Sequence, residues 1–121
     1  MNETEALILF VKKVVRADKT RRYISLIETK KSKAEFLADL YHGFEDALKD
    51  GLQSNTKLNI AMDTPCYIFD SRKGFGKPVT SLSDAYDLLA SDDGWIIVSQ
   101  DGAYGVYRPE ADWDDEIQIK I

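Results

Sequence analysis

The sequence has very little cysteine and histidine: Cys66 and His42 are the only ones among 121 residues. A lone cysteine cannot form a disulfide within the chain, so the cysteine framework of small secreted domains is excluded and the cytoplasm is the expected compartment. One histidine and one cysteine cannot supply the three or four nitrogen and sulfur ligands of a usual zinc site. We therefore expect a protein without disulfides, bound metal or cofactor.

Long hydrophobic runs are also lacking. The longest unbroken apolar run, residues 6–11, is far too short to span a bilayer, and Glu3 and Glu5 stand where a signal peptide would carry lysines. The composition, with 44% apolar and 31% charged residues, is that of a folded protein and not of a disordered one. Because 121 residues suffice for one hydrophobic core, we expect a single globular domain over 1–121 and no membrane segment.

The net charge of −5 is distributed unevenly along the chain. Residues 1–60 hold 11 Lys and Arg against 9 Asp and Glu, whereas residues 61–121 hold 5 against 12. Within the first half, residues 12–33 form a basic strip with nine Lys and Arg and only two acidic residues. Near the C-terminus, the segment PEADWDDE at 109–116 is acidic, with five carboxylates in eight positions. The chain therefore has a basic part and an acidic part.

Helical patterns dominate the first half. Apolar residues recur at helical spacing over 4–16, which predicts an amphipathic helix there. Residues 20–29 fit a helix or a strand, and we favour the helix. Ser32 and Glu35 have the spacing of a capping box, and this predicts the start of a third helix. Apolar residues line one face of that helix, which we expect to end at Asp50 and Gly51.

The second half has mostly strand patterns. Alternating apolar residues predict a half-buried strand at 58–62, and the run CYIFD predicts a buried strand at 66–70. The glycines and the proline of 71–78 are typical of a loop, whereas 81–90 has the pattern of a short helix capped by a serine. These elements, with the two described next, complete the predicted fold.

The clearest turn signal is Asp101-Gly102, which lies between two segments rich in β-branched and aromatic residues. It predicts a hairpin over 94–108 with a two-residue type I′ turn. Alternating isoleucines then predict a last strand at 117–121. Helices followed by strands indicate an α+β fold, with N-terminal amphipathic helices packed on a mainly antiparallel sheet that includes this C-terminal hairpin.

An enzyme is one interpretation of the functional residues. His42 lies within a helical turn of Glu45 and Asp46, and a histidine paired with a carboxylate can move protons. A surface histidine is the simpler interpretation, and Cys66 is expected to be a buried strand residue. The alternating carboxylates Asp112, Asp114 and Glu116 could face a divalent cation together, but they do not fit a calcium-binding loop, because Ile117 stands where that loop needs glycine. A metal-dependent or His42-dependent enzyme therefore stays an alternative.

The basic strip at 12–33 suggests a nucleic-acid-associated protein as another alternative. Several Lys and Arg on one face attract phosphate backbones regardless of sequence. An acidic chain with a pI near 4.8 opposes this interaction unless its charges are separated in space. A solvated helix surface is the preferred interpretation of the strip, and nucleic-acid binding is not expected.

The acidic segment favours a protein-binding function. Dense carboxylates are costly to bury, so they remain in water, and a tryptophan among them gains most when a partner covers it. We expect the segment to form a patch that binds a basic protein, as an immunity or inhibitor-type protein does when it occupies the substrate cleft of a nuclease. A tryptophan folded back onto the sheet is the alternative. The predicted partner-binding residues are Asp112, Trp113, Asp114, Asp115 and Glu116.

Overall fold

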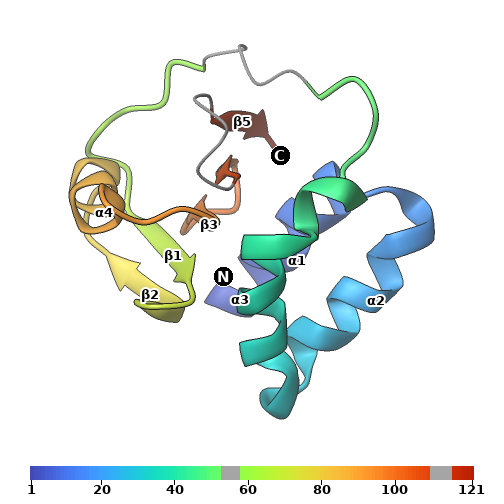
Figure 1. The fold of residues 1–121 in the computed structure, drawn as a ribbon. Coiled ribbons are helices and arrows are strands. Elements are labelled where there is room, and N and C mark those ends of the chain that lie inside the picture. The colour runs from blue at the N-terminus through green and yellow to red at the C-terminus, as the bar shows by residue number, and fades with distance from the viewer. Residues whose placement is uncertain (53–57, 110–115) are drawn as a thin grey trace.

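The structure is a computed structural model that describes residues 1–52, 58–109 and 116–121. Its fold is α+β, as the sequence predicts: a five-stranded antiparallel sheet lies between three N-terminal helices on one face and a single helix on the other (Figure 1). The elements are α1 Glu3–Val14, α2 Ala17–Glu28, η1 Lys30–Ser32, α3 Lys33–His42, η2 Phe44–Ala47, β1 Cys66–Asp70, β2 Gly74–Val79, α4 Leu82–Leu89, β3 Trp95–Ser99, β4 Tyr104–Arg108 and β5 Ile117–Lys120. None of the helices in these ranges has the length and apolarity to cross a bilayer.

The sheet has the strand order β2-β1-β3-β4-β5. Because β2 and β3 both run antiparallel to β1, they are parallel to each other, and α4 connects them by crossing over β1. Successive side chains of a strand point to opposite faces, so each strand contributes to two cores. Phe69 and Ile96 pack against the N-terminal helices, whereas Ile68 and Ile97 pack against α4. The sheet is therefore buried on both faces.

The first two helices agree with the sequence patterns. Asn2 and Glu5 form a capping box at the start of α1, which buries its predicted apolar face. The helical interpretation of 20–29 is confirmed, because α2 covers most of that range and buries Tyr23 and Ile27. α2 packs against α1 and α3 and forms the outer side of the helical layer (Figure 1).

The third helix differs from the prediction at both ends. Ser32 closes the 3-10 turn η1 with helical backbone angles, and its side chain makes no capping hydrogen bond, so the predicted capping box is wrong. The helix also ends early, at His42, because Gly43 is extended and the chain continues as η2. This break carries Phe44 into an aromatic cluster with Tyr23 and Phe36. Tertiary packing of Phe44 thus overrides the helical periodicity that continues to residue 48.

Two predictions in the next segment are also wrong. No strand forms at 58–62: the backbone N–H of Leu58 donates to the side chain of Gln118, and Met62 is exposed. The predicted loop at 71–78 instead contains β2, which is paired with β1. Gly76 has a φ of +77° at an irregularity in the pairing, which only a glycine tolerates easily, and Pro78 fits because β2 is an edge strand.

The hairpin β3–β4 is confirmed, but its turn is not type I′. That turn needs positive φ at both central residues, and here only Gly102 has it, at +72°. The connection has four residues, and it begins with a hydrogen bond from the N–H of Gly102 to the carbonyl of Ser99. The Ser99 hydroxyl donates to Asp101 at 2.7 Å and accepts from the backbone N–H groups of Ala103 and Tyr104. The hydrogen bonds of the Ser99 side chain thus stabilise a longer turn, which does not need positive φ at two successive residues.

Candidate functional site

One end of the sheet gathers acidic residues from distant parts of the sequence. The strand register places the end of β1, the start of β3, the end of β4 and the start of β5 side by side. The connections β1–β2, α4–β3 and β4–β5 therefore meet at this end. Among the described residues, it carries four carboxylates, which define what we call the acidic end: Asp70, Asp92, Asp93 and Glu116.

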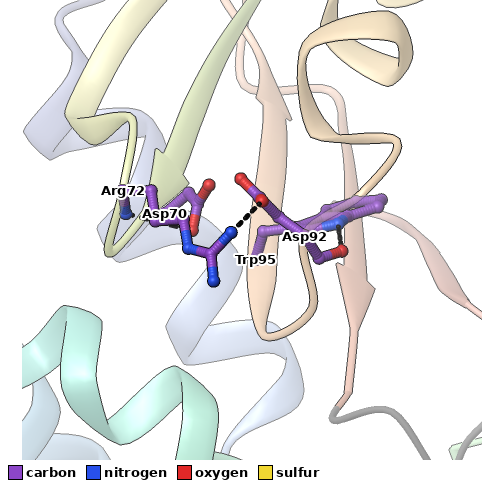
Figure 2. Close-up of polar contacts among 4 residues, drawn as sticks. All are labelled: Asp70, Arg72, Asp92 and Trp95. Carbon is purple, nitrogen blue, oxygen red and sulfur yellow. Dashed lines mark hydrogen bonds and ion pairs between the residues drawn. The ribbon is translucent and has the colours of Figure 1, made fainter.

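Two of these carboxylates lie in the interior. Asp70 is fully buried at the end of β1, and Asp92 in the α4–β3 connection is 6% exposed. Figure 2 shows their carboxyl groups pointing toward each other, with Arg72 beside them. The backbone N–H of Arg72 donates to Asp70 at 3.3 Å, and its guanidinium donates to Asp92 at 3.4 Å. The indole N–H of Trp95 donates to the backbone carbonyl of Asp92 at 2.9 Å and so fixes the connection.

The environment of this pair opposes ionisation. Burial raises the pKa of the Asp70 carboxyl group, the neighbouring Asp92 carboxyl group raises it further, and the backbone N–H of Arg72 partly offsets both effects. One carboxylate oxygen of Asp70 and one of Asp92 are buried without a hydrogen-bond partner. Unpartnered buried oxygens are uncommon and costly in folded proteins. Each residue of the pair therefore keeps one carboxylate oxygen whose hydrogen-bonding capacity is unsatisfied.

The second feature of the acidic end is a hollow between α4 and the sheet. It has a volume of about 370 Å³. Tyr86 donates its phenol to Glu116 at 2.8 Å across this hollow, and its ring meets Trp95 edge to face at 6.0 Å. Burial and the Glu116 carboxylate both raise the pKa of Tyr86, so the phenol stays protonated and remains a donor. Arg108 lies at the same hollow and pairs with Asp93 at 3.2 Å.

Of the predicted partner-binding residues, Asp112, Trp113, Asp114 and Asp115 lie outside the described residues, and the predictions for them stand as predictions. Glu116 is described, is half-buried and accepts the Tyr86 phenol. The segment that holds the four others starts after Pro109 and returns at Glu116, so both of its ends are fixed at the acidic end of the sheet.

The other predicted functional residues do not belong to this group, although Glu45 and Asp46 lie beside Pro109 and Ile117 at the same end of the sheet. His42 is the last residue of α3, and its ring stacks edge to face on Tyr41 at 5.4 Å, while Glu45 and Asp46 follow the helix break. Cys66 is buried on β1 as predicted, and burial raises the pKa of its thiol to about 11, which opposes a nucleophilic role. In the described ranges, no three His, Cys, Asp or Glu side chains come together as metal ligands.

The basic strip lies on the helical layer and mainly on its outer side. Most of it belongs to α2 and η1, which sit away from the sheet (Figure 1). Two of its arginines form ion pairs, Arg16 with Asp18 and Arg22 with Asp39. The exposed members of the strip are Lys12, Lys13, Arg21, Arg22, Lys30 and Lys31.

The sequence patterns did not identify the Asp70–Asp92 pair. A signal exists, since Asp70 ends a buried apolar run and Asp92 stands three residues before another. Only the order of the strands brings the two together, and local patterns do not contain that order. No family model matches the chain, and comparison with curated proteins and with solved structures finds no match either.

Proposed function

We propose that the protein is a non-enzymatic cytoplasmic binding protein of the immunity or inhibitor type, and that a basic protein binds at the acidic end of its sheet. The observation that carries this proposal is the convergence of Asp70, Asp92, Asp93 and Glu116 at one end of the sheet. The acidic segment with Trp113 starts after Pro109 and returns at Glu116, at this same end, and its sequence holds four further carboxylates.

Electrostatic attraction supports such a role. Complementary charges accelerate association by steering the partners together, and the effect weakens as salt screens it. Among the described residues, Arg72, Lys73 and Arg108 offset the carboxylates at this end, and Arg16 and Lys49 lie beside Pro109 and Ile117 at its edge. Most of the basic strip lies on α2 and η1, so a cationic partner that approaches the acidic end meets only part of its repulsion.

An aromatic anchor completes the proposed surface. Interface energy concentrates in a few residues, and tryptophan is among the most frequent of them. Trp113 sits between Asp112 and Asp114, where a partner would cover it and gain from removing its ring from water. The hollow beside Glu116 offers a neighbouring recess for a basic side chain of the partner.

A binding experiment tests the proposal. The partner is first captured from a lysate of the source organism with the wild-type chain and then purified, and its association rate is measured for Asp114→Lys and for the control Glu28→Lys. Both variants change the net charge by the same amount, but Glu28 is the last residue of α2, which does not belong to the acidic end. We expect a slower association for Asp114→Lys alone, at low salt only. Equal rates for the two variants would contradict a role of the acidic end.

A second candidate function is nucleic-acid binding through the basic strip. One observation favours it: most of the strip lies on α2 and η1, whereas Asp70, Asp92, Asp93 and Glu116 gather at the end of the sheet, so these opposite charges are separated in space. Fluorescence anisotropy with a labelled oligonucleotide tests it. Binding that weakens steeply with salt and is lost in Lys30→Glu/Lys31→Glu supports this function, and no binding at 50 mM salt removes it.

A further inference from the structure

The buried pair of carboxyl groups at the acidic end connects two separate parts of the chain. Asp70 ends β1 immediately before the β1–β2 turn, and Asp92 belongs to the α4–β3 connection. Asp70 is fully buried, and the side chain of Asp92 is 4% exposed. The two groups point toward each other (Figure 2). Any bond between them therefore holds the turn and the connection together.

The hydrogen bonds of the pair are half complete. Oδ1 of Asp70 accepts from the backbone N–H of Arg72, and Oδ1 of Asp92 accepts from the Arg72 guanidinium. Oδ2 of each residue is buried and has no partner. Each carboxyl group thus has one satisfied and one unsatisfied oxygen. A single proton held between the two Oδ2 atoms would satisfy both, because a protonated carboxyl group donates one hydrogen bond and a carboxylate accepts it.

The charges around the pair also favour one proton. Two carboxylates in contact cannot both ionise at low cost, and in such pairs the pKa of one member is strongly raised. The nearby cations come from the β1–β2 turn: the Arg72 side chain, which is 69% exposed to solvent, and Lys73. Asp93, beside Asp92, is engaged by Arg108 of β4. Two exposed cations screened by water compensate one buried negative charge more easily than two.

We propose that Asp70 and Asp92 share one proton in the folded protein, and that this proton is a pH-sensitive latch between the β1–β2 turn and the α4–β3 connection. Burial and the neighbouring Asp92 carboxyl group raise the pKa of Asp70 and support the assignment. When the proton leaves as the pH rises, the two carboxylates repel each other and the latch opens. The acidic end then carries one more negative charge.

The latch regulates the surface to which we assign partner binding, but it does not depend on that assignment. The proton is held by the free protein, so the latch can be tested without any partner. If a basic partner does bind at the acidic end, its affinity should increase as the pH rises through the midpoint of the pair, because the extra negative charge attracts it.

Carbon-13 NMR of the aspartate carboxyl groups over pH 3 to 8.5 tests the latch directly. In the wild-type protein, we expect Asp70 to show a transition well above the ordinary range of aspartate, because the proton that it binds is held by the pair. In Asp92→Asn, we expect the Asp70 midpoint to fall by about one pH unit or more, since the amide donates to the ionised carboxylate. The exposed Asp63→Asn is the matched control and should leave Asp70 unchanged.

Two titration results would overturn the proposal. One is titration of Asp70 in the ordinary aspartate range in the wild-type protein, and this result needs no variant to fold. The other is an Asp70 midpoint that Asp92→Asn leaves unchanged, because burial alone and not a shared proton would then raise it. Hydrogen exchange of the Trp95 indole N–H reports the latch itself, because this group donates to the backbone carbonyl of Asp92. Above the midpoint of the Asp70 transition, its exchange with solvent should accelerate by more than the ordinary effect of pH on the exchange rate. Protection that does not change across the midpoint also contradicts the latch.

Discussion

The carboxylates at the acidic end divide into two groups with the same chemistry and different surroundings. Asp70 and Asp92 are buried and face each other, whereas Glu116 is half-buried and borders the hollow beside α4. Burial turns the first group into a pair that disfavours full ionisation, whereas dense carboxylates in water stay charged. Under our two proposals, the place of a carboxylate at this end decides whether it holds a proton or offers a charge to a partner.

Charge reversal should give the largest difference in stability between a buried and an exposed carboxylate. Asp70→Lys places a buried cation beside Arg72 and leaves Asp92 without its neighbour, so we expect a loss of about 3–5 kcal/mol in the free energy of unfolding. Asp87→Lys on the exposed side of α4 should cost less than about 0.5 kcal/mol. Urea unfolding measures both. Similar losses for the two variants would mean that the burial of Asp70 does not set the cost of reversing its charge.

A disruption at the opposite end of the sheet serves as a control for position. Gly102→Val puts a β-branched side chain at a φ of +72°, and its Cβ would lie 2.7 Å from the sulfur of Met1. We expect a loss of about 2 kcal/mol in stability. The difference in stability between pH 5 and pH 7.5 should equal that of the wild-type protein, because the carboxyl pair is intact. A changed pH dependence in this variant would show that the pair is not the source of it.

The pH dependence of stability should come in part from the buried pair. The pKa of Asp70 rises from its ordinary 3.8 to about 6 in the folded protein. A raised carboxyl pKa means that the folded state binds the proton more tightly than the unfolded state. The contribution to stability therefore increases as the pH falls through 6 and is complete below 3.8. Between pH 7.5 and pH 5 we expect a gain of about 1 kcal/mol.

The gain in the free energy of unfolding is compared between the wild-type protein and Asp70→Asn. The contributions of other groups that titrate in this pH range then cancel in the difference. The wild-type protein should gain about 1 kcal/mol more than the variant on acidification from pH 7.5 to pH 5. Equal gains, or a larger gain in the variant, would exclude proton uptake by the pair in this range.

Removal of the hydrogen bond between Tyr86 and Glu116 should have the smallest effect on the free energy of unfolding. Tyr86→Phe removes the phenol that donates to Glu116 but keeps the ring beside Trp95, so we expect a loss of about 1 kcal/mol or less. Combining it with Glu116→Gln in a double-mutant cycle isolates the contribution of the hydrogen bond. Additive losses would mean that the bond does not form in solution, and the hollow would then have no fixed acidic wall.

The sequence predicts the parts of this fold that depend on local periodicity. The helical face of α1, the serine cap of α4 and the buried run of β1 follow from residue spacing, and all are confirmed. The end of α3 could not be predicted, because Phe44 leaves the helix to pack on rings from other elements. The glycines and the proline of β2 predict a loop, but they suit an edge strand with a bulge equally well.

The candidate site was predicted only in part. Its acidic segment is visible as a run of carboxylates, whereas the Asp70–Asp92 pair depends on the crossover that places β3 beside β1. Arg72, which contacts both carboxyl groups, lies in a segment predicted as loop and has no pattern of its own. Contacts between residues 22 positions apart follow from strand order, and neither periodicity nor charge counting contains that information.

Fluorescence quenching of the two tryptophans tests the central comparison most directly. Trp95 is 2% exposed beside the buried pair, whereas we expect Trp113 to lie at the surface among ionised carboxylates. In Trp95→Phe, Trp113 should be quenched readily, and caesium ions should quench it better than iodide because the surrounding carboxylates attract cations. In Trp113→Phe, Trp95 should be shielded from both ions. If Trp113 is as shielded as Trp95, or if iodide quenches it better than caesium, the acidic end is not the exposed anionic surface that we propose.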